Sequence, residues 1–143
     1  MEEKIAQLDH VGIATNDIEE SSTFWEMIGL VKDHDDEIVE EQGVKVRYLS
    51  SPKGGENQAK IELLEPLGED TPIGKFLSKK GPGIQQLCIR VENLELLLEK
   101  LHDSGIQLIN RIPKKGSNGS LIAFIHPKST GGVLVELSQK INS

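Results

Sequence analysis

The chain has 143 residues, 36% of them hydrophobic and 27% charged, which is typical of a globular protein without a membrane span. The net charge of −7 argues against nucleic-acid binding, which requires a basic face, and we expect neither a signal peptide nor a membrane partner. Cys88 is the only cysteine, so a disulfide framework is excluded, and we expect a cytoplasmic protein.

The first part of the chain predicts a strand followed by a helix. The strand covers residues 7–15 and carries His10 on one of its two faces. Asp17 is placed to start the helix and Gly29 to end it. The residues at the helical spacing of one packed face are Ile18, Ser21, Trp25 and Ile28.

A short strand within residues 33–42, two longer strands and a linker complete this half. Strands are expected at residues 44–50 and 59–65, and the second of them carries Glu62 between apolar neighbours. Residues 67–83 form a linker in which a short helix opens at Pro72, where the missing N–H of proline is harmless.

The second half repeats this plan. A strand is expected at residues 84–92, followed by a helix that Asn93 starts and Gly105 ends. Three further strands are expected at residues 106–112, 121–125 and 133–138.

The two halves align with each other residue by residue. A shift of 76 places His10 on Gln86 (86 − 10), and a shift of 74 places Glu62 on Glu136 (136 − 62), with loop lengths absorbing the difference. We therefore predict an α+β fold in which two tandem βαβββ modules pair into a cupped mixed sheet around a central metal cleft.

The predicted domain organisation follows from this repeat. Neither module buries a core well alone, so we expect a single domain over residues 1–143. Within it, module one covers about 7–66, the linker helix about 67–83, and module two about 84–139.

The repeat also groups four side chains that suit a metal ion. A carboxylate between apolar neighbours is costly to bury unless something compensates its charge. We predict that a divalent ion does so, and a set of nitrogen and oxygen donors favours Co, Ni, Zn or Mn. The expected ligands are His10, Glu62, Gln86 and Glu136. In the alternative interpretation, both glutamates lie on the solvent face of half-exposed strands.

Five stretches between Leu8 and Leu137 carry a family resemblance: LDHVGIA, EEQGVKVRYL, KIELLEPLGEDTPIGKFL, GPGI and FIHPKSTGGVLVEL. Together they resemble the methylmalonyl-CoA epimerase family of the vicinal oxygen chelate superfamily, which also contains glyoxalase I and the bleomycin-resistance proteins. By position, the resemblance implies His10, Glu62 and Glu136 as metal ligands. The family usually reads GIHH where this chain has GIQQ, so Gln86 stands in place of a histidine ligand.

The resemblance implies an enzyme that interconverts (2R)- and (2S)-methylmalonyl-CoA by proton transfer at the α carbon, in a homodimer. Glu136 is expected to be one of the two groups that remove and return the proton. The second acid or base stays open: some relatives carry a glutamate where this chain has Val46, and His126 and Lys60 are candidates. The lysines expected near the CoA phosphates are Lys114, Lys115 and Lys128, which can equally be ordinary surface residues.

Two alternative functions remain at this point. One is a different isomerase of the glyoxalase superfamily, and the other is a metal-poor protein that binds a small ligand in the same cleft. An iron-dependent ring-cleaving dioxygenase is disfavoured, because its two-histidine, one-carboxylate site would require a histidine in place of Gln86.

Overall fold

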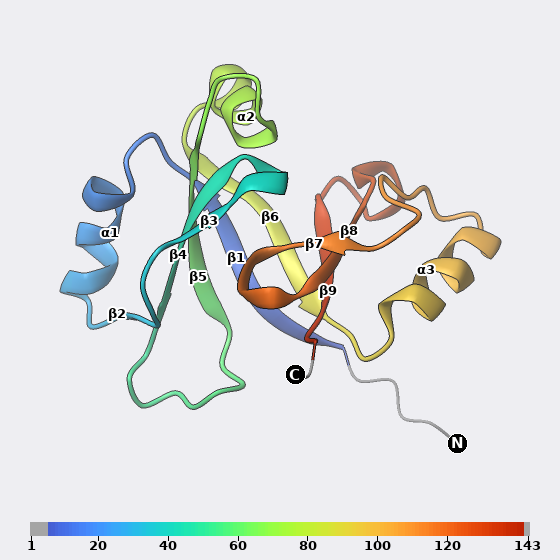
Figure 1. Cartoon of the computed structure of the whole chain (residues 1–143), viewed down its shortest axis with the longest axis horizontal. Helices are drawn as coiled ribbons and strands as arrows, with labels where there is room; N and C mark the ends of the chain where they lie inside the picture. Colours follow the sequence, from blue (N-terminus) through green and yellow to red (C-terminus); the bar gives the residue numbers. More distant parts are fainter. Residues whose placement is uncertain (1–5, 142–143) are drawn as a thin grey trace. The chain divides into compact units, whose positions relative to one another are not determined.

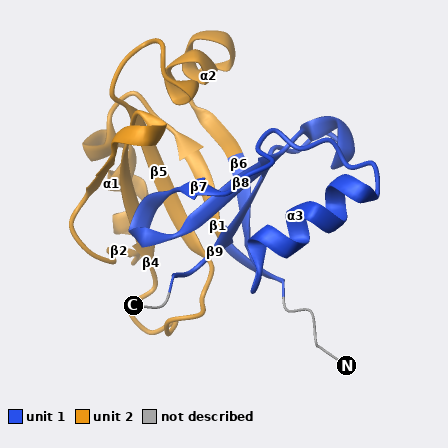
Figure 2. Cartoon of the chain, turned by 45° about the vertical axis from the view of Figure 1, so that its right-hand side comes forward, with its two compact units in different colours: residues 1–9, 86–143 blue, residues 10–85 orange. Residues whose placement is uncertain are grey.

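The computed structural model describes residues 6–141, which contain three α-helices and confirm the predicted α+β class (Figure 1). The chain divides into two compact units, coloured separately in Figure 2. The first unit in chain order, drawn in orange, comprises residues 10–85, and the second, drawn in blue, comprises residues 86–141 together with residues 6–9. No helix within residues 6–141 is long and apolar enough to cross a membrane.

The unit of residues 10–85 is built on a mixed sheet. β1 (Gln7–Ala14) runs parallel to β5 (Lys60–Pro66), and β5 pairs antiparallel with β4 (Val44–Ser50). Two short strands, β2 (Val31–Lys32) and β3 (Glu37–Val39), both pair antiparallel with β4. The strands are short enough, and sufficiently rich in β-branched residues, to suit a half-buried sheet.

The two helices of this unit contact different clusters of its core. α1 (Ile18–Met27) starts at Asp17, as predicted, and contacts β4 and β5, where Ile18 packs with Leu49 and Leu63. α2 (Pro72–Lys80) contacts β5 and belongs to the other cluster. That second cluster joins the helix residues Ile73, Phe76 and Leu77 to Ala14, Val39, Val44, Val46, Tyr48 and Leu64.

The second unit repeats the sheet. β6 (Gly83–Arg90) runs parallel to β9 (Val135–Gln139), which pairs antiparallel with β8 (Leu121–Ile125). β7 (Lys114–Lys115) pairs antiparallel with β8, and α3 (Leu94–Asp103) packs against β8 and β9. Short 3-10 turns cover Glu40–Gln42 in the first unit and Ser117–Gly119 and Pro127–Ser129 in the second.

Equivalent hydrogen bonds confirm that the two units follow one plan. The Glu65 carboxylate accepts the Ile18 N–H at the start of α1 at 2.9 Å, and the Gln139 amide oxygen accepts the Leu94 N–H at the start of α3 at 2.8 Å. These partners are related by the same shifts of 74 and 76 that the sequence predicts. The glycines that follow the two helices both have positive φ: Gly29 (110°) and Gly105 (85°).

One predicted strand is wrong. Residues 106–112 form no strand, and only Leu108 makes an isolated bridge. Asn110 breaks the ladder, because its side-chain oxygen accepts the Phe124 N–H at 2.9 Å in place of a backbone carbonyl. The backbone N–H groups of Ile109 and Asn110 both turn to the Phe124 carbonyl oxygen, at 2.9 and 3.3 Å, so the regular alternation of a strand is lost.

The expected packed face of the first helix is also wrong in part. Trp25 is half-buried and packs on the cluster around Ile18, but Ile28 is 60% exposed. Ile28 is the residue at which the helix ends, with ψ near 0°, so its side chain no longer follows the helical spacing.

Candidate metal centre

The first unit brings together His10 and Glu62, as the sequence analysis predicts. The His10 Nε2 lies 3.1 Å from the Glu62 Oε1, and the two residues are only 3% and 4% exposed. In the parallel register of β1 and β5, Gly12 is the partner of Glu62, so a residue without a side chain stands opposite the carboxylate. His10 lies two residues before Gly12 and therefore on the same face of β1. Because Gly12 has no side chain, the His10 imidazole has room to reach the Glu62 carboxylate.

The second unit brings together Gln86 and Glu136, at the equivalent positions. The Gln86 Nε2 donates a hydrogen bond to the Glu136 Oε1 at 3.0 Å, and the two residues are 4% and 7% exposed. Each unit therefore buries one glutamate on its last strand against one polar side chain from its first strand. The interpretation that the glutamates face solvent is wrong.

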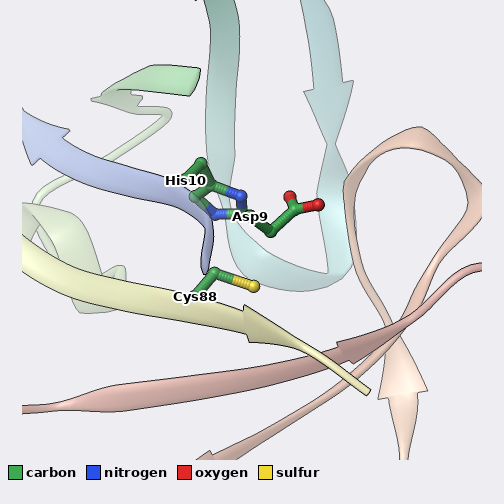
Figure 3. A group of neighbouring side chains, drawn as sticks. All are labelled: Asp9, His10 and Cys88. Atoms are coloured by element: carbon green, nitrogen blue, oxygen red, sulfur yellow. The ribbon is translucent and has the colours of Figure 1, made fainter. Parts of the chain in front are cut away.

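Cys88 has the structural role that its burial suggests. It lies on β6, where Figure 3 labels it, and its thiol donates a hydrogen bond to the Ser138 hydroxyl at 3.3 Å. His10 is labelled on β1 in the same figure. Cys88 is the register partner of Glu136, as Gly12 is of Glu62, so both units place a small residue opposite the buried glutamate.

A polar network that the sequence analysis missed adjoins His10 in the first unit. Tyr48 is the register partner of Glu62, and its ring meets the His10 ring edge-on, with centroids 5.3 Å apart. The Lys60 ammonium lies 6.0 Å from the Tyr48 ring centroid and forms an ion pair with Asp33. Asp33 also accepts a hydrogen bond from Ser50.

The charge of Asp33 is fixed by these contacts. Burial alone would raise the pKa of Asp33, but the hydrogen bonds from Lys60 and Ser50 outweigh it and leave the pKa below its ordinary value. Asp33 therefore stays ionised and holds Lys60 over Tyr48. The only signal in the sequence was the alternation in residues 44–50, which places Tyr48 on one face but names no partner for it.

A second buried charge belongs to Arg47 in β4. Its guanidinium donates to both oxygens of Asp36, at 2.8 and 2.7 Å, and also pairs with Glu19 in α1. The hydrogen bond from Arg47 holds the pKa of Asp36 below its usual range, and the two carboxylates raise the pKa of Arg47. This network joins α1, β4 and the segment between β2 and β3.

The donor atoms of the two pairs suit a divalent ion. The first pair offers an imidazole nitrogen and a carboxylate, and the second pair offers an amide oxygen and a carboxylate, all on buried side chains. A carboxylate offsets part of the charge of a divalent cation, and nitrogen and oxygen donors match a borderline metal. Buried carboxylates without such a partner are costly, so the residues present fit the metal that the sequence predicts.

The lysines expected near the CoA phosphates lie at the surface of the second unit. Lys115 and Lys128 are exposed, and Lys114 is half-buried in β7. Their role in substrate binding stays a prediction. His126, a candidate for the second acid or base, accepts the Lys128 N–H at 3.1 Å in the turn before β9, and its role in proton transfer stays a prediction.

Comparison with known proteins gives consistent results. A model of the Glyoxalase/Bleomycin resistance protein/Dioxygenase superfamily matches residues 9–124. Uncharacterized protein YqjC of Bacillus subtilis is 42% identical over 134 residues, covering 93% of this chain and 91% of that protein. The ethylmalonyl-CoA/methylmalonyl-CoA epimerase of Cereibacter sphaeroides is 36% identical over 142 residues, covering 94% of this chain and 98% of that protein.

Solved structures agree with the sequence relatives. The methylmalonyl-CoA epimerase from Mycobacterium tuberculosis has a TM-score of 0.86 at 39% identity, covering 95% of this chain and 89% of that one. A methylmalonyl-CoA epimerase in complex with methylmalonyl-CoA and NH4+ has a TM-score of 0.85 at 34% identity, with 95% of each chain covered. The resemblance stated from the sequence is confirmed: this chain belongs to the methylmalonyl-CoA epimerase family of the glyoxalase/bleomycin resistance protein/dioxygenase superfamily.

Proposed function

We propose that this chain is an epimerase that interconverts (2R)- and (2S)-methylmalonyl-CoA by moving a proton at the α carbon of the thioester. One observation carries the proposal: in a chain of this family, two glutamates are buried at repeat-equivalent positions, each against a polar side chain. Buried carboxylates of this kind are expensive to maintain for stability alone.

We further propose that the two units form one domain and that the two pairs hold one divalent ion, with His10, Glu62, Gln86 and Glu136 as ligands. The equivalence of the pairs under the repeat supports this arrangement, as does their donor chemistry. Co, Ni, Zn and Mn all suit such a donor set. When bound, the ion supplies positive charge that stabilises the enolate oxygen of the deprotonated thioester.

Glu136 is the proposed base. Its carboxylate is buried, and the Gln86 amide holds one of its oxygens, so the group is oriented before the substrate arrives. A carboxylate held in this way would take the α proton from one face of the substrate, and a second acid would deliver a proton to the opposite face of the planar enolate. In the reverse direction the two groups would exchange these roles. Val46 cannot supply that proton, because its side chain has no ionisable group.

The proposal also covers the binding of the CoA group, the oligomeric state and the location of the protein. The CoA phosphates require cations, and Lys114, Lys115 and Lys128 are the proposed contacts. We also propose a homodimer, and a cytoplasmic location because a chain with one buried thiol suits a reducing compartment.

Deuterium uptake tests the activity directly. Protein loaded with cobalt is incubated with one epimer of methylmalonyl-CoA in D2O, and mass spectrometry follows the label at the α carbon while chiral chromatography follows the epimer ratio. We expect both exchange and epimerisation. If metal-loaded protein produces neither, the proposal fails.

The matched control is Glu65→Gln. Glu65 lies on the same strand as Glu62 but accepts the Ile18 N–H, and the equivalent residue in the other unit, Gln139, does this with an amide. Glu65→Gln should therefore keep both the fold and the exchange. Metal analysis of the same samples separates an epimerase from a metal-poor binding protein.

A further inference from the structure

The His10 imidazole packs against the ring of Tyr48, and the two rings meet edge-on with their centroids 5.3 Å apart. Both residues are buried, with 3% and 5% of their surface exposed. An edge-to-face contact between buried rings restricts the plane of each ring. The plane of the imidazole decides whether its Nε2 points at the Glu62 carboxylate, so Tyr48 is placed to set the direction of a proposed metal ligand.

The segment between β2 and β3 holds Tyr48 in turn. The Asp33 N–H donates to the Tyr48 carbonyl oxygen at 3.0 Å, and the His34 ring lies with its centroid 5.9 Å from that of Tyr48. The Asp33 carboxylate pairs with the Lys60 ammonium, which lies 6.0 Å from the centroid of the Tyr48 ring. Ser50 donates a hydrogen bond to the same carboxylate. We call Asp33, Tyr48, Ser50 and Lys60 together the Tyr48 clamp.

The register of the sheet places this clamp directly beside the His10–Glu62 pair. Lys60 is the partner of His10 in the parallel register of β1 and β5, and Tyr48 is the partner of Glu62 in the antiparallel register of β4 and β5. Lys60 and Glu62 are two residues apart in β5, so their side chains lie on the same face. Each member of the pair therefore has a clamp residue as its neighbour on the adjacent strand.

The second repeat follows the same plan without the charges of the clamp. With the shifts of 76 and 74, the positions of Asp33, Tyr48 and Lys60 are occupied by apolar residues, namely Ile109, Phe124 and Leu134.

The first-strand residues of the two repeats differ in a matching way. The first repeat has an imidazole, His10, where the second has an amide, Gln86. An imidazole binds a metal through one of two distinct ring nitrogens, whereas an amide oxygen offers two lone pairs on a flexible side chain. The clamp thus occurs in the repeat whose proposed ligand depends most on its orientation.

We propose that the Tyr48 clamp positions His10, by holding the imidazole in the plane in which Nε2 faces Glu62 and can bind a divalent ion. Tyr48 acts on His10 directly, and Lys60 and Asp33 act through Tyr48. The inference rests on the metal-ligand role of His10 within the proposed function, but not on the identity of the substrate. Loss of a group that orients a metal-binding histidine typically weakens metal affinity about tenfold to a hundredfold.

Charge and position predict opposite results for Lys60, and this contrast supplies the test. Removal of a nearby ammonium relieves the repulsion of a divalent cation, so a role through charge alone predicts tighter metal binding in Lys60→Met. The clamp predicts binding that is about tenfold weaker, because Tyr48 loses the group that lies over its ring. Isothermal titration with cobalt chloride measures the affinity, and circular dichroism checks that the fold is unchanged.

The visible absorption of bound cobalt provides a second measurement, because it depends on the geometry of the ligands. We expect the absorption spectrum to change in Lys60→Met and to return toward that of the wild type in Lys60→Arg, which keeps a cation over the ring. A role in stability alone would leave the spectrum of the bound ion unaltered.

A double variant tests whether Asp33 and Lys60 act as one unit. Asp33→Asn should weaken cobalt binding about threefold to tenfold, because it releases Lys60 from its partner. The double variant of Asp33→Asn and Lys60→Met should lose no more affinity than Lys60→Met alone. It leaves the net charge of the pair unchanged, so a purely electrostatic role predicts wild-type affinity.

The matched control is Lys45→Met. Lys45 lies three residues before Tyr48, on the other face of β4, and forms an ion pair with Asp36. Its removal takes away one lysine from the same strand region without touching the clamp, and cobalt affinity should stay at the wild-type value.

The possible outcomes separate this inference from the proposed function. Tighter or unchanged cobalt binding in Lys60→Met, an unaltered absorption spectrum, a double variant with wild-type affinity, or an equal loss in Lys45→Met would each overturn the clamp. A wild type that binds no cobalt would overturn it together with the proposed metal site. Cobalt binding that responds as expected in a protein without deuterium exchange would support the clamp and contradict only the proposed epimerase.

Discussion

The two repeats surround their buried glutamates with different side chains. In the first, Tyr48 is the register partner of Glu62, whereas Phe124 is the register partner of Glu136 in the second. The shift of 74 that aligns the glutamates also aligns Lys60 with Leu134. The register partner of one glutamate is therefore a tyrosine that belongs to a network of charged groups, while the register partner of the other is a phenylalanine, and this second glutamate accepts a hydrogen bond from Gln86.

The two repeats also differ on the face of each sheet that packs against its helix. Arg47 is buried in an ion-pair network in the first repeat, and the corresponding residue in the second is Ala123, part of the apolar cluster under α3. Duplication thus preserved the backbone and the carboxylates, while the surrounding charges diverged. We infer different roles for the two glutamates: Glu62, in the first repeat, contributes mainly to metal binding, whereas Glu136, in the second, is the proposed base.

The largest effect is expected when each of the two glutamates is replaced, in a separate variant, by glutamine. Glu136→Gln should lower deuterium exchange about a thousandfold, because it removes the proposed base. Glu62→Gln should weaken metal binding but lose far less activity when metal is saturating. Exchange rates are measured over a metal titration, and equal losses in the two variants at saturation would show that Glu136 is not the base.

The next effect concerns the buried ion pair. Arg47→Ala should lower the free energy of unfolding by about 3 kcal/mol, because it leaves the Asp36 carboxylate without its main partner. Urea unfolding measures the change. Since Ala123 occupies the equivalent site, alanine itself fits the strand, and an unchanged stability would mean that the network contributes nothing.

The dependence of the free energy of unfolding on pH also tests the contribution of the Arg47–Asp36 ion pair. Because the Arg47 contact lowers the pKa of Asp36 in the folded state, its contribution is fully present above the unfolded value of about 4 and is lost as the pH falls through the lowered value. The wild type should lose more stability between neutral pH and about pH 3 than Arg47→Ala does. Parallel losses in the two proteins would assign the acid sensitivity to other carboxylates.

A smaller change is expected from making the two first-strand residues alike. Gln86→His should tighten cobalt binding about tenfold, because imidazole is a better donor than an amide oxygen. Isothermal titration with the metal alone measures it. An unchanged affinity would remove Gln86 from the proposed ligands without affecting His10.

The smallest effect concerns α1 itself. Ser22 is fully buried, and its hydroxyl has no hydrogen-bond partner in the part of the chain that the structure describes, while the equivalent Leu98 belongs to the core of the second unit. Ser22→Ala should raise the free energy of unfolding by about 1 kcal/mol, since it removes an unsatisfied polar group. A loss of stability in thermal unfolding would show that the hydroxyl has an unrecognised role.

Much of this architecture was predictable because the two halves of the sequence can be aligned, so each element of one half supports the prediction of its counterpart in the other. Each glutamate and its first-strand partner were found by aligning one half with the other, and the caps Asp17 and Asn93 followed from the same alignment. Periodicity alone was misleading at residues 106–112, where one asparagine side chain takes over a backbone hydrogen bond.

The network around Tyr48 was not predictable in this way. Asp33 lies in an acidic turn, and nothing in its sequence context indicates which of the neighbouring carboxylates reaches back over the sheet to Lys60. Contacts between a loop and a strand depend on the path of the chain in three dimensions. The second repeat offers no counterpart, because the residues equivalent to Asp33, Tyr48 and Lys60 are Ile109, Phe124 and Leu134.

The bonds that anchor the helix starts have a consequence for how the chain folds. Glu65 and Gln139 reach back over 47 and 45 residues to hold the first turns of α1 and α3. Each helix is made early on the ribosome but acquires its anchor only when the last strand of its repeat has emerged. A nascent chain halted before residue 60 would thus expose α1 without its support, and folding of each repeat should occur in one late step instead of helix by helix.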